Sequence, residues 1–155
     1  MKNKLKFLGL ILALGLIQAT ALDIFKVFNI KPDLLLIIVV IAALRYELKW
    51  VIIFSFAAGF FKDIFSASSF GMNSALFVMW GYLIYRANKE VSIDYDLIRL
   101  ALMALVAALN FILTQAILVY LGNYIPLGVF LRGIILQVIY TTLVFPLLYK
   151  LIKHE

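Results

Sequence analysis

The sequence contains no cysteine, and its single histidine, His154, is the penultimate residue. The absence of cysteine excludes disulfides, thiolate metal sites and a cysteine nucleophile. Because histidine occurs only in the tail, the apolar part of the chain can build neither a serine–histidine pair nor a histidine zinc site. We therefore predict no catalytic residue, no metal site and no cofactor.

Charge is scarce as well. Only 14% of the 155 residues are charged, whereas 66% are hydrophobic, a composition far from that of a soluble domain. Long apolar runs recur from end to end without the alternation of a membrane-spanning strand, so they favour helices. We predict an all-α polytopic membrane protein, in which residues 1–155 form a single integral membrane domain surrounded by the lipid bilayer.

The apolar runs predict six transmembrane helices. The first resembles a secretory signal, because lysines precede it and Ala19-Thr20-Ala21 fits a cleavage site. We expect this segment to be retained, since it is long enough for a span and five hydrophobic segments follow it. The predicted spans are residues 5–22, 32–44, 50–64, 70–85, 97–121 and 127–149.

The second and third spans are short. Their apolar runs, Leu34 to Leu44 and Trp50 to Phe61, cover 11 and 12 residues. These lengths correspond to about 16 to 18 Å, against a hydrocarbon core of about 30 Å. Each run must therefore include flanking residues, thin the bilayer or be shielded by protein. A single helix through both would place Arg45, Glu47 and Lys49 at its middle, so a tight hairpin is expected.

The basic residues indicate topology. The net charge is +6, but these residues occur in ones to threes between apolar runs and form no stripe for a phosphate backbone, so no nucleic acid partner is expected. If both termini are cytoplasmic, ten of the 14 basic residues lie on the inner side, as the positive-inside rule requires. These ten are Lys2, Lys4, Lys6, Arg45, Lys49, Arg86, Lys89, Arg99, Lys150 and Lys153.

One helical face leads to a carboxylate. Ser55, Gly59 and Asp63 follow at i, i+4 and i+8, so two small residues that admit a neighbouring backbone precede the acid. Asp63 either engages a partner inside the membrane or, with Lys62, ends the helix at the outer interface. If the helix continues past Asp63, the carboxylate lies below the surface, where Lys62 or a partner protein would satisfy it. No second intramembrane carboxylate is available for paired acid and base chemistry.

The segment after Asp63 reads as an irregular connection. A turn is expected at Gly71, and Asn73 then enters the next helix as a polar group that either caps it or meets a partner.

Three ordered stretches resemble the MreD family of rod-shape-determining proteins. They are Pro32-Asp33-Leu34-Leu35-Leu36 at the second span, Gly59-Phe-Phe-Lys-Asp63 at the third, and Phe70-Gly71-Met72-Asn73-Ser74-Ala75 with Trp80-Gly81-Tyr82 in the fourth. The resemblance covers nearly the whole chain. The candidate helix-packing or partner-interface residues are Pro32, Asp33, Ser55, Gly59, Asp63, Gly71, Asn73 and Gly81.

The resemblance implies a non-enzymatic scaffold in the bacterial cytoplasmic (inner) membrane. Such a scaffold belongs to the elongation complex (elongasome) of peptidoglycan synthesis and supports rod shape by docking an MreC-type bitopic membrane protein. The implied further partners are MreB, RodA and the transpeptidase partner of RodA. No small-molecule substrate is expected.

The alternative is a substrate-binding subunit (S-component) of an energy-coupling-factor transporter for a vitamin or metal. The MreD family looks distantly similar to these subunits and is expected to share their six-helix bundle. The subunits typically carry an alanine motif in the first helix for docking, of which Gly9-x-x-x-Ala13 is a partial analogue. Aromatic and polar residues for a pocket are sparse. A third possibility, an intramembrane enzyme, lacks a catalytic pair.

Overall fold

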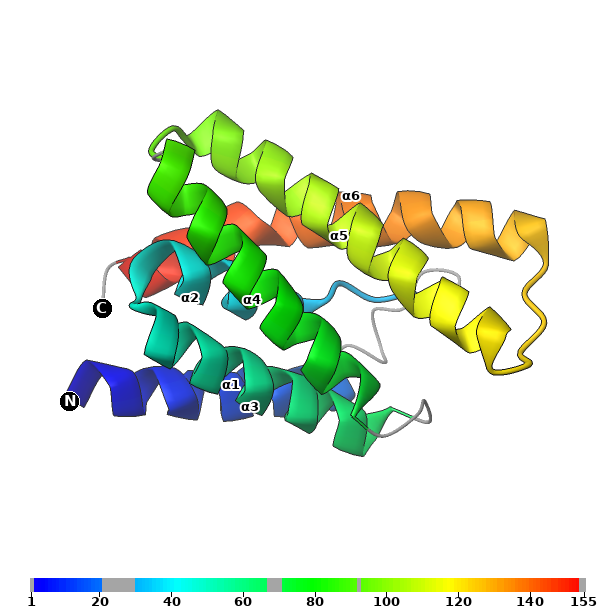
Figure 1. The fold of residues 1–155 in the computed structure, drawn as a ribbon, viewed down its shortest axis with the longest axis horizontal. Helices are drawn as coiled ribbons and strands as arrows, with labels where there is room; N and C mark the ends of the chain where they lie inside the picture. Colours follow the sequence, from blue (N-terminus) through cyan, green and yellow to red (C-terminus); the bar gives the residue numbers. More distant parts are fainter. Residues whose placement is uncertain (1, 21–29, 67–70, 92, 154–155) are drawn as a thin grey trace.

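The protein is a bundle of helices (Figure 1). The structure, a computed structural model, describes residues 2–20, 30–66, 71–91 and 93–153. The regular elements in these ranges are six helices, which confirms the predicted all-α class. They are α1 (Lys2–Ala19), α2 (Leu34–Arg45), α3 (Leu48–Phe65), α4 (Met72–Val91), α5 (Asp96–Tyr120) and α6 (Leu127–Lys153).

The shortest helix, α2, forms the centre of the bundle. Every residue from Leu34 to Ala43 is buried, and α2 packs against each of the other five helices. An apolar run that is enclosed on all sides needs no polar face, which explains why the segment shows no helical periodicity. Of the ways to accommodate so short a run, the structure therefore uses shielding by protein.

The connection between α2 and α3 is the expected tight hairpin. Helix α2 ends at Arg45, Tyr46 is extended with φ −113° and ψ 162°, and α3 begins at Leu48. Arg45 Nη1 donates to the carbonyl oxygen of Ile152 at 2.8 Å, so the hairpin is attached to the end of α6.

Several helices extend beyond the predicted bounds. Helix α3 includes 18 residues, and α4 continues to Val91, six residues beyond the predicted end, because Ala87, Lys89 and Glu90 are good helix formers. The pattern that resembles a cleavage site includes Ala21, and the predicted fourth span begins at Phe70; both residues lie outside the described part of the chain.

Among the described residues, two helices are long and apolar enough to cross a membrane, Asp96–Tyr120 and Leu127–Ile152. These helices also expose the most large apolar side chains. The other long helices carry charge: three lysines in α1, Lys49, Lys62 and Asp63 in α3, and a charged last turn in α4. The structure thus supports two spans by length and composition, and the six-span topology stays a prediction.

Candidate functional site

Two buried carboxylates mark the region where α3 ends and where α2 and α4 begin. Asp33 and Asp63 are 2% and 3% exposed, so each is removed from solvent and requires hydrogen bonds. Both were expected from the sequence as packing or partner residues, but the sequence did not predict that a second carboxylate, Asp33, would be buried in the same region as Asp63. The structure shows which groups satisfy them.

Asp63 caps the first turn of α4. Its Oδ1 accepts from the backbone N–H of Asn73 at 3.0 Å and from Asn73 Nδ2 at 2.9 Å. Its Oδ2 accepts from the backbone N–H of Ser74 at 3.0 Å and from Ser74 Oγ at 2.7 Å. The first N–H groups of a helix have no intrahelical acceptor, and the helix dipole favours an anion there. A carboxylate of α3 therefore holds α4 by four hydrogen bonds.

Gly59 allows α3 and α4 to approach closely enough for this cap. A Cβ at Gly59 would lie 2.7 Å from the carbonyl oxygen of Asn73 and from the nitrogen of Ser74, where no side chain can move aside. One turn earlier in α3, Ser55 faces Gly81 of α4, and a Cβ at Gly81 would overlap the Ser55 hydroxyl. The predicted face of Ser55, Gly59 and Asp63 thus packs against α4 of the same chain.

Lys62, one of the two partners expected for Asp63, does not pair with the neighbouring acid. Its ammonium forms an ion pair with Asp33 Oδ2 and lies 4.9 Å from the centre of the Phe77 ring. The reason is geometric, because adjacent helix residues point about 100° apart. The two consecutive charged residues of α3 therefore bind different groups: Lys62 pairs with Asp33, and Asp63 caps α4.

Asp33 joins four helices. Its Oδ1 caps α2 by accepting from the Leu36 N–H at 3.1 Å, and also accepts from Gln18 Nε2 of α1 at 3.3 Å. The Asp33 backbone N–H donates to Thr141 Oγ1 of α6 at 3.3 Å, and Lys62 supplies the contact from α3. Pro32, which precedes the cap, is buried as well. We call this set of contacts the Asp33 junction.

Gln18 completes the cap of α2. Its Oε1 accepts from the Leu35 N–H at 3.0 Å, while its Nε2 serves Asp33. The oxygen and the nitrogen of the Gln18 side-chain amide therefore both form hydrogen bonds that join α1 to the start of α2.

The Asp33 junction lies beside the middle of α6. Thr141 follows the first residue of α6 by 14 positions and precedes the last by 12, so at about 1.5 Å per residue α6 continues roughly 20 Å beyond the junction. Figure 1 shows α5 and α6 projecting together past the start of α4. The buried charges thus sit at the level of the central part of the longest helix.

Gly71 lies just before α4, as the turn prediction requires. Its φ is +92°, a conformation that favours glycine, and no atom lies within 4 Å of a Cβ built there. Glycine is therefore favoured at position 71 by its backbone conformation and not by a lack of space for a side chain.

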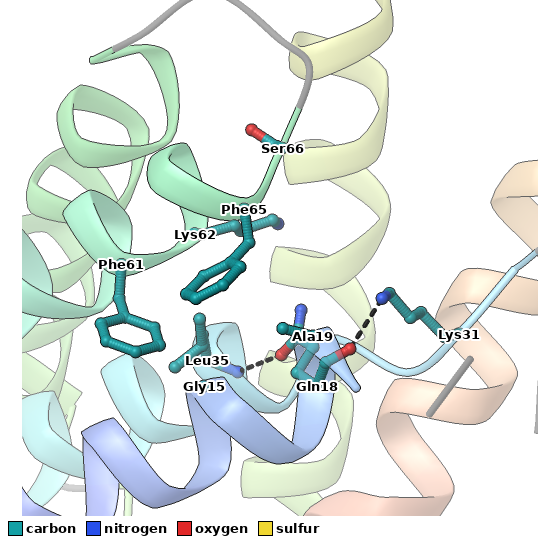
Figure 2. A pocket seen from close by; sticks show the side chains of 9 residues that line it. All are labelled: Gly15, Gln18, Ala19, Lys31, Leu35, Phe61, Lys62, Phe65 and Ser66. Carbon is teal, nitrogen blue, oxygen red and sulfur yellow. Dashed lines mark hydrogen bonds between the residues drawn. The ribbon is translucent and has the colours of Figure 1, made fainter. Parts of the chain in front are cut away.

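A cavity of about 290 Å³ borders the Asp33 junction. Figure 2 shows the rings of Phe61 and Phe65 near one wall and Lys31 on the opposite side, where Lys31 Nζ donates to the Gln18 carbonyl oxygen at 2.7 Å. Lys62 lines the same cavity. The volume is at the small end of ligand sites, which span about 300–1,000 Å³.

The geometry favours a structural use of both acids. Each carboxylate fixes the first turn of a helix, and the described residues contain no group of three His, Cys, Asp or Glu side chains that could hold a metal ion. The hydrogen bonds and the ion pair of the two acids hold α1, α2, α3, α4 and α6 in fixed register.

A family model described as rod shape-determining protein MreD matches residues 1–154, essentially the whole chain. The chain belongs to the MreD family. The searches of curated proteins and of solved structures returned no match. Membership of the MreD family, which comprises shape-determining structural proteins, supports a membrane role in determining rod shape.

The stretches that resemble MreD coincide with the capped helix ends. Pro32 and Asp33 directly precede α2, and Gly59 and Asp63 belong to the last part of α3. Gly71 directly precedes α4, and Asn73 lies in its first turn. Sequence reasoning missed Gln18, the bond between Asp33 and Thr141, and the pairing of Lys62 with Asp33. A signal for Gln18 was present, because it lies seven residues after Ile11 and four after Leu14, on the buried face of α1.

Proposed function

We propose that the chain is a non-enzymatic membrane scaffold of the bacterial cell-wall elongation complex, which docks an MreC-type bitopic membrane protein and supports rod shape. In this proposal MreB, RodA and its transpeptidase partner belong to the same assembly. The observation that carries it is the MreD family match over residues 1–154. The use of both buried carboxylates as helix caps supports it, since the polar groups serve the shape of the bundle.

We further propose that all six helices cross the inner membrane with both termini in the cytoplasm. The contacts of the basic residues support this orientation, because Lys4 lies 4.4 Å from the centre of the Trp50 ring and Arg45 bonds to the end of α6. Basic residues of α1, α2 and α6 therefore gather at one end of the bundle, as positive-inside topology requires. In this orientation the Asp33 junction lies near mid-membrane depth, where unpaired charge is most costly.

The capped region acts indirectly in this proposal. Ser55, Gly59, Asp63 and Gly81 are in contact inside the chain, so they fix the angle and register of α3 against α4 and thereby the shape of the outer surface that a partner meets. Large apolar side chains on that surface, such as Phe56 and Phe60 of α3, are exposed. A partner helix would recognise this surface by close packing within the membrane.

Recovery of an MreC-type partner from detergent-solubilised membranes tests the proposal. Gly59→Leu should lower recovery much more than Leu35→Ile, although Leu35 is also buried, because only the first change inserts atoms against a backbone. Recovery is normalised to the protein that elutes as a monodisperse peak, so that unfolded protein does not count. Equal recovery by the two folded variants would contradict a docking role that depends on the α3 and α4 packing.

A substrate-binding subunit of an energy-coupling-factor transporter is the second candidate. The cavity beside Lys31 and Lys62 favours it, as does the position of Gly9 and Ala13 on an exposed face of α1, which leaves that motif accessible. A vitamin that binds the folded protein should raise its melting temperature by mass action. Affinity purification from the native membrane separates the candidates: wall-elongation proteins support the scaffold, and a transporter ATPase supports the transporter subunit.

A further inference from the structure

A second cavity lies at the end of the α5 and α6 pair where α5 begins and α6 ends. It has a volume of about 280 Å³ and lies between the first turn of α5 and the last turns of α6. Its polar wall contains Arg99, Lys150 and Asp96, and its apolar wall contains Phe145 and Pro146. None of these residues belongs to the Asp33 junction or to the cap of α4.

Arg99 is held in a fixed position. Its Nε donates to the Ile93 carbonyl oxygen at 3.2 Å, its Nη1 donates to Asp96 Oδ1 at 2.9 Å, and its guanidinium lies 5.0 Å from the centre of the Tyr149 ring. The side chain is only 15% exposed. A guanidinium offers five N–H donors in a rigid fork that fits phosphate, and prior immobilisation lowers the entropy lost on binding.

The cavity has an excess of positive charge. Among the described residues, Arg99 and Lys150 both line it, and the one acidic residue in its wall, Asp96, has a side chain that is 89% exposed. An ion pair with so exposed a carboxylate is screened by solvent and contributes little. Two cations therefore remain to attract an anion.

The opposite wall is apolar and buried. Phe145 is 2% exposed, and Pro146 lies within α6 beside it. Within the part of the chain that the structure describes, α5 and α6 are the two helices long and apolar enough to cross a membrane, and the cavity lies where α5 begins and α6 ends. A ligand that suits both walls has an anionic group next to an apolar part, and at about 280 Å³ the space admits a headgroup rather than a whole lipid.

We propose that this cavity binds the phosphate of an anionic phospholipid headgroup, with Arg99 and Lys150 as the two cationic contacts. Basic pockets between transmembrane helices on the cytoplasmic side are known to bind such headgroups. The assignment to the cytoplasmic leaflet rests on the orientation given under the proposed function. The binding itself rests only on the cavity, and the bound lipid would link the ends of α5 and α6.

Thermal unfolding in mixed micelles tests the binding. A neutral detergent is supplemented with phosphatidylglycerol or, at the same mole fraction, with phosphatidylcholine. Phosphatidylglycerol should raise the melting temperature of the native chain relative to phosphatidylcholine, because it binds the folded state. Lys150→Gln should lose most of this difference. Lys89→Gln, which removes an exposed lysine of α4 outside the cavity, should retain it.

Two further arms complete the test. Arg99→Lys keeps the charge but not the fork, and it should weaken the response to phosphatidylglycerol. Inorganic phosphate at the same concentration should give no comparable rise in melting temperature. An equal response of Lys150→Gln and Lys89→Gln, or equal protection by inorganic phosphate, would overturn the proposal. Micelles contain no partner protein and have no cytoplasmic side, so failure here would leave the scaffold proposal standing.

Discussion

The two buried aspartates lie in neighbouring parts of the bundle, yet they are satisfied in different ways. Asp63 accepts four hydrogen bonds of 2.7 to 3.0 Å, all from two consecutive residues of one helix. The Asp33 carboxylate instead pairs with Lys62 and accepts hydrogen bonds from Gln18 and from the first turn of α2. Its backbone N–H donates to Thr141. The N-terminus of α4 therefore satisfies the Asp63 carboxylate without a cation. The Asp33 carboxylate, which is shared among several helices, has the Lys62 ammonium among its partners.

The comparison also distinguishes two mechanical roles. The Asp63 cap is local and depends on the close approach of α3 and α4 at Gly59. The Asp33 junction is distributed, so that the loss of one member leaves contacts from other helices. We expect substitutions at the cap to destabilise the bundle more than substitutions at the junction.

The largest effect is expected from Gly59→Leu. The new side chain would push α4 away from α3 and also pull Asn73 and Ser74 from Asp63, so the loss should exceed about 3 kcal/mol in the free energy of unfolding. Equilibrium unfolding in detergent micelles, followed by circular dichroism, measures it. Gly9→Leu is the matched control, since no atom lies within 4 Å of a Cβ built there. Similar losses in both variants would refute the role of close packing at Gly59.

Asp63→Asn should have the next largest effect. The amide is similar in shape, but its NH₂ group would face the donors of Asn73 or Ser74, which should lower the free energy of unfolding by about 2 to 3 kcal/mol. Asp96→Asn, at an exposed carboxylate, is the control in the same unfolding measurement. A change no larger than that of the control would show that Asp63 does not hold α4.

Lys62→Met should destabilise the bundle less, by about 1 to 2 kcal/mol, because the lysine side chain is 22% exposed and Asp33 keeps its other partners. A double-mutant cycle with Asp33→Asn isolates the pair. The double variant should be more stable than the sum of the single losses predicts. Strict additivity would mean that the ion pair contributes no coupling energy.

The smallest effect is expected from Ser55→Ala. The Ser55 hydroxyl is buried without a hydrogen-bond partner among the described residues, so its removal should be neutral or raise the free energy of unfolding by up to about 1 kcal/mol. Ser74→Ala, which removes the 2.7 Å bond to Asp63, should be destabilising. If Ser55→Ala proved as damaging as Ser74→Ala, the hydroxyl would have a function that this packing does not explain.

The sequence predicted the all-α class and placed three candidate packing residues on one helix face, for physical reasons. Apolar runs and the charges between Arg45 and Lys49 determine where helices can form and break, and helical periodicity placed Ser55, Gly59 and Asp63 on one face. The helix partner of that face was not predictable, because periodicity is local and says nothing about which neighbour it meets.

Long-range pairing was beyond such reasoning. Lys62 and Asp33 are 29 residues apart, and Thr141 is 108 residues from Asp33. No spacing rule connects positions that only the folded bundle brings together. The central position of α2 was missed for the same reason, since an uninterrupted apolar run gives equal grounds for contact with lipid or with protein.

Both ends of α2 are attached to α6, the sixth of the described helices along the chain. Asp33 bonds to Thr141 near one end of α2, and Arg45 bonds to Ile152 at the other. The ribosome therefore completes α2 at Arg45 more than 80 residues before it reaches Leu127, the first residue of α6. Until then α2, whose residues Leu34 to Ala43 are all buried in the described structure, has one open side, and α6 is the helix that covers it.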